Sequence, residues 1–334
     1  MFKLIDKYDN VLRYFLNENN LFFTSEKMDN GGEIKKMDLS NGNLIASKST
    51  GSALFTFTKN ANGFLAKDIS GNGLLFSYLL DKPIEIPSPT KVGENHVLTD
   101  FISVYQGRIK NREFGIYSIS SNDVLWMSSQ LKALEVFGDK IFGQSEFVIY
   151  RTAPDTGRLL WKSDLKTKYR ELIGIRGGVR ILGLCENLVI AAIENIDKLI
   201  ALDLATGVLK WDRTTLAGFY KLDIIKSKLH IITGAYKCLD PISGNALDSF
   251  DDQQYFKEVG IFSQRNNYAI DGDHLITTDY QKGIIGALNT ATHKFDWLHE
   301  EEGVSFPTPS PVVYQAPYLL VHDNRGTLHI FQKE

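Results

Sequence analysis

The chain has 334 residues, of which 43% are hydrophobic and 23% are charged, and its formal net charge is −3. This composition excludes a wholly disordered chain and a collagen-like fibre. The slight acidic excess argues against a dedicated nucleic-acid binder, because such proteins present a basic surface to phosphate groups. At about 150 residues per domain the length alone predicts two domains, although some β architectures form one domain of this size.

The first residues and the cysteines bear on the compartment in which the protein works. Lys3, Asp6 and Lys7 interrupt the apolar runs near the N-terminus, so this stretch does not resemble a secretory signal. No apolar stretch in the chain approaches the roughly 20 residues that span a bilayer. Cys185 and Cys238 lie in apolar runs, which favours two buried thiols over a disulfide. We therefore expect a cytoplasmic protein with no membrane partner.

A strand–turn–strand unit recurs along the chain. Its clearest copy, residues 201–211, reads ALDLATGVLKW. Gly207 stands where the turn requires a positive φ, and the Thr206 hydroxyl can bond the turn backbone. Asp203 is suited to accept backbone N–H bonds from the same turn. The other copies occupy residues 36–46, 116–126, 151–161, 238–248 and 287–297.

Tryptophan closes the four strongest copies of the unit. Its side chain is large enough to wedge between neighbouring sheets, so we expect these residues to hold successive units together. Ala46 and Asp248 occupy the same position in weaker copies. The four tryptophans are Trp126, Trp161, Trp211 and Trp297.

The unit resembles the tryptophan-docking motif of the quinoprotein-like, PQQ-type β-propellers. One copy matches this motif at every defined position, through Ala201, Asp203, Thr206, Gly207 and Trp211. Residues 287–297 match it except at Asn289 and His293. The resemblance covers nearly the whole chain and implies an all-β propeller of four-stranded blades, in which the motif joins one blade to the next.

The spacing of the units predicts the number of blades. The long gap between the hairpins that end at 46 and 126 predicts a further hairpin in residues 74–86, turning at Asp81–Pro83. After residue 297 the chain offers three strands, and residues 2–6 can supply a fourth. We predict one β-propeller domain over residues 1–334, closed by pairing of its N- and C-terminal strands. Eight blades would have about 42 residues each, and seven blades are the alternative.

The resemblance also raises the question of a cofactor. Quinoprotein dehydrogenases with this motif carry a disulfide between adjacent cysteines and a carboxylate–amide cluster for calcium, and neither is visible in this sequence. None of the seven histidines has a paired metal-ligand spacing. The sequence also lacks a phosphate loop, a dinucleotide fingerprint and a nucleophile elbow. We therefore predict a protein that is not an enzyme, with no catalytic residue, no cofactor and no metal.

Charged connections between the predicted blades carry the remaining functional signal. Residues 162–180 contain six basic and two acidic residues, whereas residues 248–258 and 296–302 are acidic. Separated charges of both signs favour a protein partner over a polyanion, because they steer and orient an approaching surface. The same runs are also compatible with ordinary solvated loops. We predict a monomeric, non-catalytic platform that binds a protein and no nucleic acid through Lys166, Lys168, Arg170, Tyr220, Tyr255, Glu300, Glu301 and Phe306.

Aromatic and aliphatic residues in these connections fall into two groups. The first group recurs eight residues after a hairpin end, a spacing that predicts packing between blades: Leu54, Leu134, Tyr169, Phe219 and Phe256. Tyr220, Tyr255 and Phe306 fall outside this register, so they are the candidates for an exposed contact surface. The alternative function is a small-molecule or glycan binder, or a hydrolase, that uses the central channel of the propeller.

Overall fold

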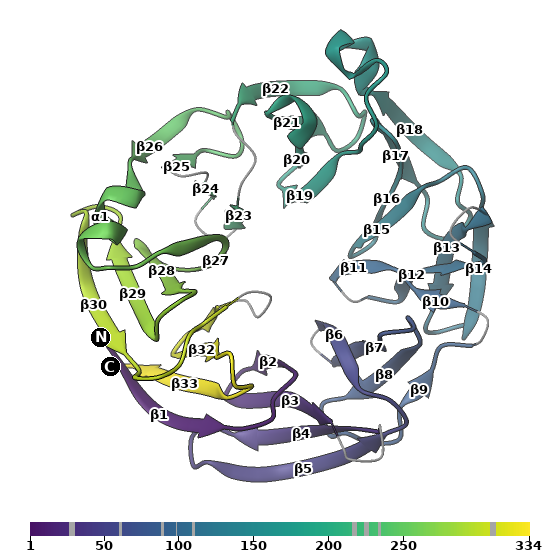
Figure 1. Ribbon diagram of the computed structural model, residues 1–334. Helices are drawn as coiled ribbons and strands as arrows, with labels where there is room; N and C mark the ends of the chain where they lie inside the picture. Colours follow the sequence, from purple (N-terminus) through teal and green to yellow (C-terminus); the bar gives the residue numbers. More distant parts are fainter. Residues whose placement is uncertain are drawn as a thin grey trace. The chain divides into compact units, whose positions relative to one another are not determined.

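The computed structural model describes the chain apart from residues 27–30, 60–61, 88–89, 98, 109–110, 216–218, 224–226, 233–234 and 308–311. Its strands form eight sheets (Figure 1). The chain divides into two compact units. Unit 1 comprises residues 1–55, 231–237 and 249–334, and unit 2 comprises residues 56–230 and 238–248.

Three sheets lie in unit 1. The first contains β2 (Arg13–Asn17), β3 (Asn20–Glu26), β4 (Gly32–Asp38) and β5 (Asn43–Thr50). The second contains β27 (Ser263–Asp271), β28 (His274–Asp279), β29 (Ile284–Asn289) and β30 (Lys294–Glu300) and is preceded by helix α1 (Asp252–Glu258). The third runs β1-β33-β32-β31, with β31 (Val313–Gln315), β32 (Tyr318–His322), β33 (Leu328–Lys333) and β1 (Phe2–Tyr8). In this last sheet Phe2 pairs with Lys333 and Tyr8 with Leu328, which confirms the predicted pairing of the chain ends.

Four sheets belong to unit 2, except that Leu54 and Phe55, the first two residues of the first strand, fall in unit 1. The first contains β6 (Leu54–Lys59), β7 (Gly63–Asp68), β8 (Gly73–Ser77) and β9 (Ile84–Glu85), and the second contains β10 (Lys91–Val92), β12 (Phe101–Gln106), β13 (Glu113–Ser118) and β14 (Asp123–Ser128). The third contains β15 (Ala133–Phe137), β16 (Lys140–Ser145), β17 (Val148–Thr152) and β18 (Leu159–Asp164). The fourth contains β19 (Arg180–Cys185), β20 (Leu188–Ile193), β21 (Lys198–Asp203) and β22 (Leu209–Thr214). The sheet of β15 to β18 has a fifth strand, β11 (Glu94–Val97), which pairs in parallel with β15. The predicted hairpin in residues 74–86 is confirmed, because Leu75 of β8 pairs with Ile84 of β9.

The remaining sheet contains β23 (Phe219–Asp223), β24 (Lys228–Ile232), β25 (Tyr236–Leu239) and β26 (Ala246–Phe250). With it, the chain has eight four-stranded antiparallel blades, which define an eight-bladed β-propeller. The predicted fold class and blade number are therefore confirmed. Both cysteines, Cys185 and Cys238, are free and buried, as the sequence predicts.

Burial along each blade follows the position of the strand. All six residues of the apolar strand β20 are buried, and Val189, Ala191 and Ile193 lie in one core cluster with residues of the preceding sheet. In the outermost strand β18 only Trp161 is buried, and Leu159 and Leu160 are exposed. A single cluster joins Phe142, Phe147 and Trp161 of one sheet to Val189 and Ala191 of the next. The core of unit 2 therefore lies between successive sheets rather than within one of them.

The turns of the repeated unit have the predicted chemistry. Gly207 has a φ of +72°. The Asp203 carboxylate accepts the N–H groups of Ala205 and Thr206 at 3.0 and 2.9 Å. The hydrogen bond from the Thr206 hydroxyl to Asp203, followed by a bond from Lys210, holds the pKa of the Asp203 carboxyl below its ordinary value. Equivalent Asp side chains, Asp38 and Asp240, accept hydrogen bonds from their own turns.

Three of the tryptophans dock onto the turn of the following blade. Trp161 donates its Nε1–H to the Leu204 carbonyl at 2.9 Å, and its ring lies flat on Gly207. A Cβ atom at Gly207 would stand 2.5 Å from the Trp161 ring. Trp126 and Trp211 repeat these contacts on Gly157 and Gly244. Glycine is therefore required at this turn position for two reasons. It adopts the positive φ easily, and it has no Cβ atom that would clash with the neighbouring indole.

Two blade junctions in unit 1 use other residues for the same purpose. Phe250, two residues beyond Asp248, stacks on His293 with ring centroids 4.3 Å apart. His293 replaces the turn glycine and still has a φ of +58°. At the next junction Trp297 packs on Phe2, with ring centroids 5.1 Å apart, because the two chain ends stand in place of a turn.

Replacement of Trp211 by alanine is expected to lower the free energy of unfolding by about 3–5 kcal/mol, because it removes a buried aromatic ring and leaves a cavity. Trp211 is 8% exposed, and its Nε1–H bonds to the carbonyls of Pro241 and Ile242. Chemical denaturation followed by circular dichroism measures the change. The control, Leu159→Ala, removes a half-exposed side chain and should change the stability by no more than about 0.5 kcal/mol. Equal effects of the two substitutions would contradict the docking role of Trp211.

Candidate functional site

The predicted basic connection is the most prominent loop of unit 2. It leaves β18 through two 3₁₀ turns, η2 (Leu165–Thr167) and η3 (Arg170–Leu172), which Figure 1 draws as short coils beyond β18. Asp164 begins the first turn by accepting the Lys166 N–H at 3.0 Å. Leu165, Tyr169, Leu172 and Val179 anchor the loop in the core cluster. The buried Tyr169 also donates its hydroxyl hydrogen to Asp212 at 2.7 Å.

The basic residues of this loop differ in how they are used. Lys166 is half-buried and forms an ion pair with Glu146, and Arg180 forms one with Glu194 at 2.7 Å. Lys168 and Arg170, two of the predicted contact residues, are exposed, as is Arg176. No side-chain hydrogen bond or ion pair joins these three cations to another residue in the part of the chain that the structure describes. The loop therefore presents uncommitted positive charge to solvent.

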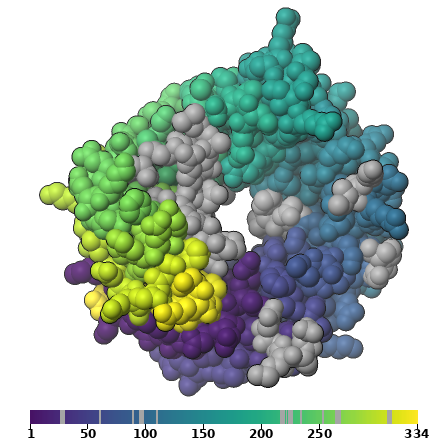
Figure 2. All heavy atoms as spheres, in the orientation of Figure 1, coloured from purple at the N-terminus to yellow at the C-terminus, as the bar shows by residue number. Residues whose placement is uncertain are grey.

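Two exposed isoleucines accompany these charges. Ile173 is 66% exposed and Ile175 is 36% exposed, on either side of Gly174, whose φ is +83°. In Figure 2 the teal segment that contains this loop stands out from the surface of its own unit. The sequence places both isoleucines in the charged connection 162–180, but the contact residues predicted there are cations, so Ile173 and Ile175 are not among them. The glycines at 174, 177 and 178 are the signal that could have marked this stretch as an exposed loop.

The predicted tyrosines are both half-buried. Tyr220 lies under the Arg180 guanidinium, whose carbon is 5.0 Å from the ring centroid, and burial raises the pKa of Tyr220 to about 12. Tyr255 belongs to α1 in unit 1, where its ring contacts Phe250 and His293 at centroid distances of 6.1 and 5.5 Å. Tyr255 thus adds to the junction that Phe250 and His293 form.

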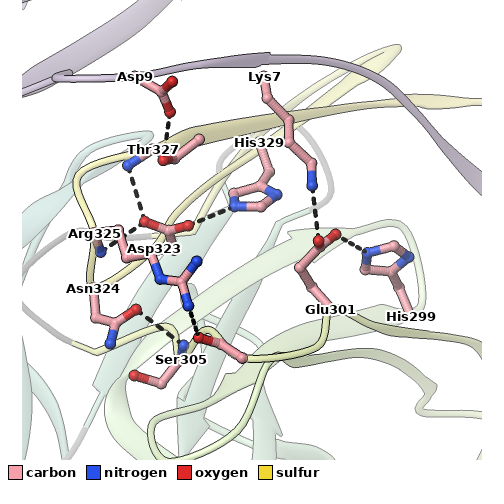
Figure 3. A network of polar contacts seen from close by, with 11 residues as sticks. Lys7, Asp9, His299, Glu301, Ser305, Asp323, Asn324, Arg325, Thr327 and His329 are labelled. Atoms are coloured by element: carbon pink, nitrogen blue, oxygen red, sulfur yellow. Dashed lines mark hydrogen bonds and ion pairs between the residues drawn. The ribbon is translucent and has the colours of Figure 1, made fainter.

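The predicted acidic residues of unit 1 also have different roles. Glu300 is exposed at the end of β30. Glu301 is held by Lys7 at 2.8 Å and faces His299 at 3.6 Å (Figure 3). The hydrogen bond from Lys7 is the main reason that the pKa of Glu301 lies below its ordinary value. Glu301 therefore ties the end of β30 to β1 through Lys7.

The prediction that Phe306 is a surface residue is wrong. Phe306 is 0% exposed and belongs to the core cluster of unit 1. Its N–H donates to the Asp279 carbonyl at 3.2 Å, and its ring meets the edge of His329 at a centroid distance of 5.5 Å. The cause is that Phe306, which follows β30, packs together with Trp297 and Phe331 in this cluster. The register rule is confirmed for Leu54, Leu134, Tyr169 and Phe256, which are buried, whereas the side chain of Phe219 lies outside the described residues.

A buried network of polar contacts fixes the neighbouring turn (Figure 3). Asp323 and His329 are 4% and 1% exposed, and their Oδ2 and Nε2 atoms are 2.9 Å apart. The other Asp323 oxygen accepts the N–H groups of Arg325 and Thr327. Burial alone would raise the pKa of Asp323, but the bonds from His329 and the two backbone groups outweigh it, so the pKa lies below its ordinary value. This carboxylate holds the 323–327 turn in one conformation.

Among the described residues, no group of three or more His, Cys, Asp or Glu side chains is placed to hold a metal ion. No helix within that part of the chain is long and apolar enough to cross a membrane. The loops described above are held by hydrogen bonds and carry exposed charged and apolar side chains.

Comparison with known proteins identifies the fold alone. No family model matches the chain, and no curated protein matches its sequence. Among solved structures, BamB from Moraxella catarrhalis is 12% identical over 99% of this chain and 100% of its own, with a TM-score of 0.66. The C-terminal WD40 domain of Sif2 is 11% identical over 100% of this chain and 99% of its own, with a TM-score of 0.68. A europium-containing methanol dehydrogenase is 8% identical over 99% of this chain and 93% of its own, with a TM-score of 0.63. The protein therefore shares the β-propeller fold of these structures, which include BamB, a WD40 domain and a methanol dehydrogenase.

The free energy of unfolding is expected to fall in acid partly through Asp323. Because its pKa is lower in the folded chain than in the unfolded chain, Asp323 contributes stability above about pH 3.9, and this contribution is lost as the pH falls through the folded value. Asp323→Asn should lower the stability at neutral pH by about 1–3 kcal/mol and flatten its decline below pH about 4. Denaturation series at several pH values test this, with the exposed Asp155→Asn as the control. An unchanged pH slope in Asp323→Asn would show that the buried pair does not contribute.

Proposed function

We propose that this protein is a non-catalytic propeller that binds another protein, and that the 165–178 loop of unit 2 is a principal contact. The observation that carries this proposal is the combination of three exposed cations with two exposed isoleucines on a loop held by three buried anchors, Leu165, Tyr169 and Leu172. Interfaces need apolar side chains that lose water and charges that orient the partner. A loop with buried anchors also loses little conformational entropy when it binds.

The partner contact that we propose keeps two of the residues that the sequence predicts and adds three others. Lys168 and Arg170 belong to it, together with Ile173, Ile175 and Arg176. Lys166 contributes less, because its ammonium group is already paired with Glu146. The charge of the loop makes an acidic surface with an apolar centre the best complement.

Two of the structural neighbours support a binding role by analogy of fold, since BamB and the Sif2 WD40 domain are not named for a reaction. The methanol dehydrogenase shows that the same fold also carries enzymes. Fold alone does not decide between these functions, so our proposal depends on the loop.

Reversal of the two predicted cations, Lys168→Glu with Arg170→Glu, should reduce partner capture at least about tenfold, because the altered charges repel an acidic surface. Affinity capture from a lysate of the source cells, quantified by mass spectrometry, compares this variant with the unaltered protein. The melting temperature should stay the same, because both side chains are exposed.

The matched control reverses two exposed cations outside the loop, Arg158→Glu and Lys294→Glu. Arg158 precedes the first residue of β18 and Lys294 is the first residue of β30, whereas the connection to the next blade leaves from the last residue of each strand. The control should retain the partner. Equal loss in both double variants would show a general charge effect, and equal retention would exclude the loop as the contact.

A further inference from the structure

Two cavities in unit 2 share one wall. The first, of about 330 Å³, is lined by residues of β7, β12 and β13 and by the start of β15. The second has a volume of about 450 Å³ and is also lined by Leu131. Arg112, Phe114 and Lys132 line both cavities. Neither cavity uses a residue of the 165–178 loop.

Arg112 is held in place by aromatic rings instead of by an acid. Its guanidinium carbon lies 4.3 Å from the centroid of Tyr105 and 6.0 Å from that of Phe114. These two rings belong to directly paired residues of β12 and β13. Stacking on aromatic faces fixes the plane of a guanidinium group without neutralising its charge.

The hydrogen-bonding capacity of Arg112 is unused within the described part of the chain. Its Nε atom is buried and has no hydrogen-bond partner there, and no ion pair neutralises the guanidinium. A buried donor without a partner costs free energy, so this arrangement favours a ligand that accepts from it. Guanidinium groups present a planar pair of donors that match the two oxygens of a carboxylate or a phosphate.

Two lysines add to the positive charge of the smaller cavity. Lys132 is exposed at its rim, and its backbone N–H is fixed by the Gln144 carbonyl at 2.7 Å. Lys67 lines the same cavity, with its Nζ 3.5 Å from the Gly93 carbonyl. The one acid in the lining, Asp68, accepts two hydrogen bonds from Asn72. Three cations from three separate segments therefore converge against a single, already bonded carboxylate.

The walls of the smaller cavity are suited to an apolar group beside the anion. Val92, Leu134 and Phe114 contribute apolar surface, and Tyr105 contributes an aromatic face. Binding pockets for small molecules commonly combine such walls with a few polar groups that fix the orientation of the ligand.

We propose that the cavity bordered by Arg112, Lys67 and Lys132 binds a small organic oxyanion, a phosphate or carboxylate attached to an apolar or aromatic group. The guanidinium of Arg112 donates to the oxyanion, the two ammonium groups complement its charge, and the apolar part of the ligand packs on Phe114 and Leu134. No chemical step is involved, because the site positions donors and no nucleophile. The site would let a small metabolite occupy a propeller whose loops contact a protein.

Isothermal titration of the full chain tests the proposal with three probes: inorganic phosphate, phenyl phosphate and phenylacetate. Phenyl phosphate should bind several-fold more tightly than inorganic phosphate, because its ring buries apolar surface. Sodium chloride at matched ionic strength controls for general screening. A carboxylate preference would show as tighter binding of phenylacetate. Failure of all three probes to bind the unaltered protein would overturn the proposal.

Arg112→Gln should weaken binding of the preferred probe by about tenfold or more, since it removes the charged donors. Arg112→Lys keeps the charge but loses the planar donor pair, so it should give an intermediate loss. The matched control, Arg158→Gln, replaces an exposed arginine of a turn outside both cavities and should bind as the unaltered protein does.

A second variant, at an exposed residue, tests the site even if Arg112→Gln does not fold. Lys132 is exposed, so Lys132→Gln should leave the melting temperature unchanged while it weakens binding several-fold. Unaltered affinity in both Arg112→Gln and Lys132→Gln would exclude this site, even where a probe binds elsewhere on the protein.

Discussion

The packing of an indole ring on the turn glycine of the next blade is the interaction on which this fold depends. A four-stranded blade has two apolar faces and is not stable alone, so each face must be covered by a neighbouring sheet. Trp161 covers the outer edge of that interface and ties it by a hydrogen bond to the Leu204 carbonyl. The contact works only where the turn offers a residue without a Cβ, which is why Gly207 and Trp161 belong to one unit of packing although they lie in different blades.

Two junctions show that the packing matters more than the residues that achieve it. Phe250 with His293, and Trp297 with Phe2, cover the same kind of edge without the glycine contact. His293 adopts a positive φ that a glycine would adopt more easily. Its ring contacts that of Phe250 with a tilt of 34° between the ring planes. Such exchanges keep the fold while they erase the sequence pattern, in agreement with a shared fold at 8 to 12% identity.

Some polar residues of the connections hold the turns in place, and others are exposed and free to contact a partner. In unit 1, Asp323 with His329 and Lys7 with Glu301 fix the turns that surround them, so charges that look available in the sequence are already paired. In unit 2 the 165–178 loop pairs Lys166 with Glu146 near its start. Its exposed cations, Lys168, Arg170 and Arg176, lie farther along the loop. Arg112 is a third case, since aromatic rings hold it and leave its donors unused. These differences arise from which neighbour each side chain meets, and spacing along the chain does not record that.

The sequence by itself predicted the fold class, the repeat and the pairing of the chain ends, and it favoured eight blades over seven. It could do so because turn glycines, capping acids and docking tryptophans act within a few residues or at a fixed repeat distance. Only the tertiary structure decided that Phe306 is buried, that β11 adds to a neighbouring blade, and that Ile173 and Ile175 are exposed. Only the structure brought Arg112, Lys67 and Lys132 to one cavity. The physical reason is that burial and charge pairing depend on contacts between segments far apart in the chain, and these are set when the blades pack together.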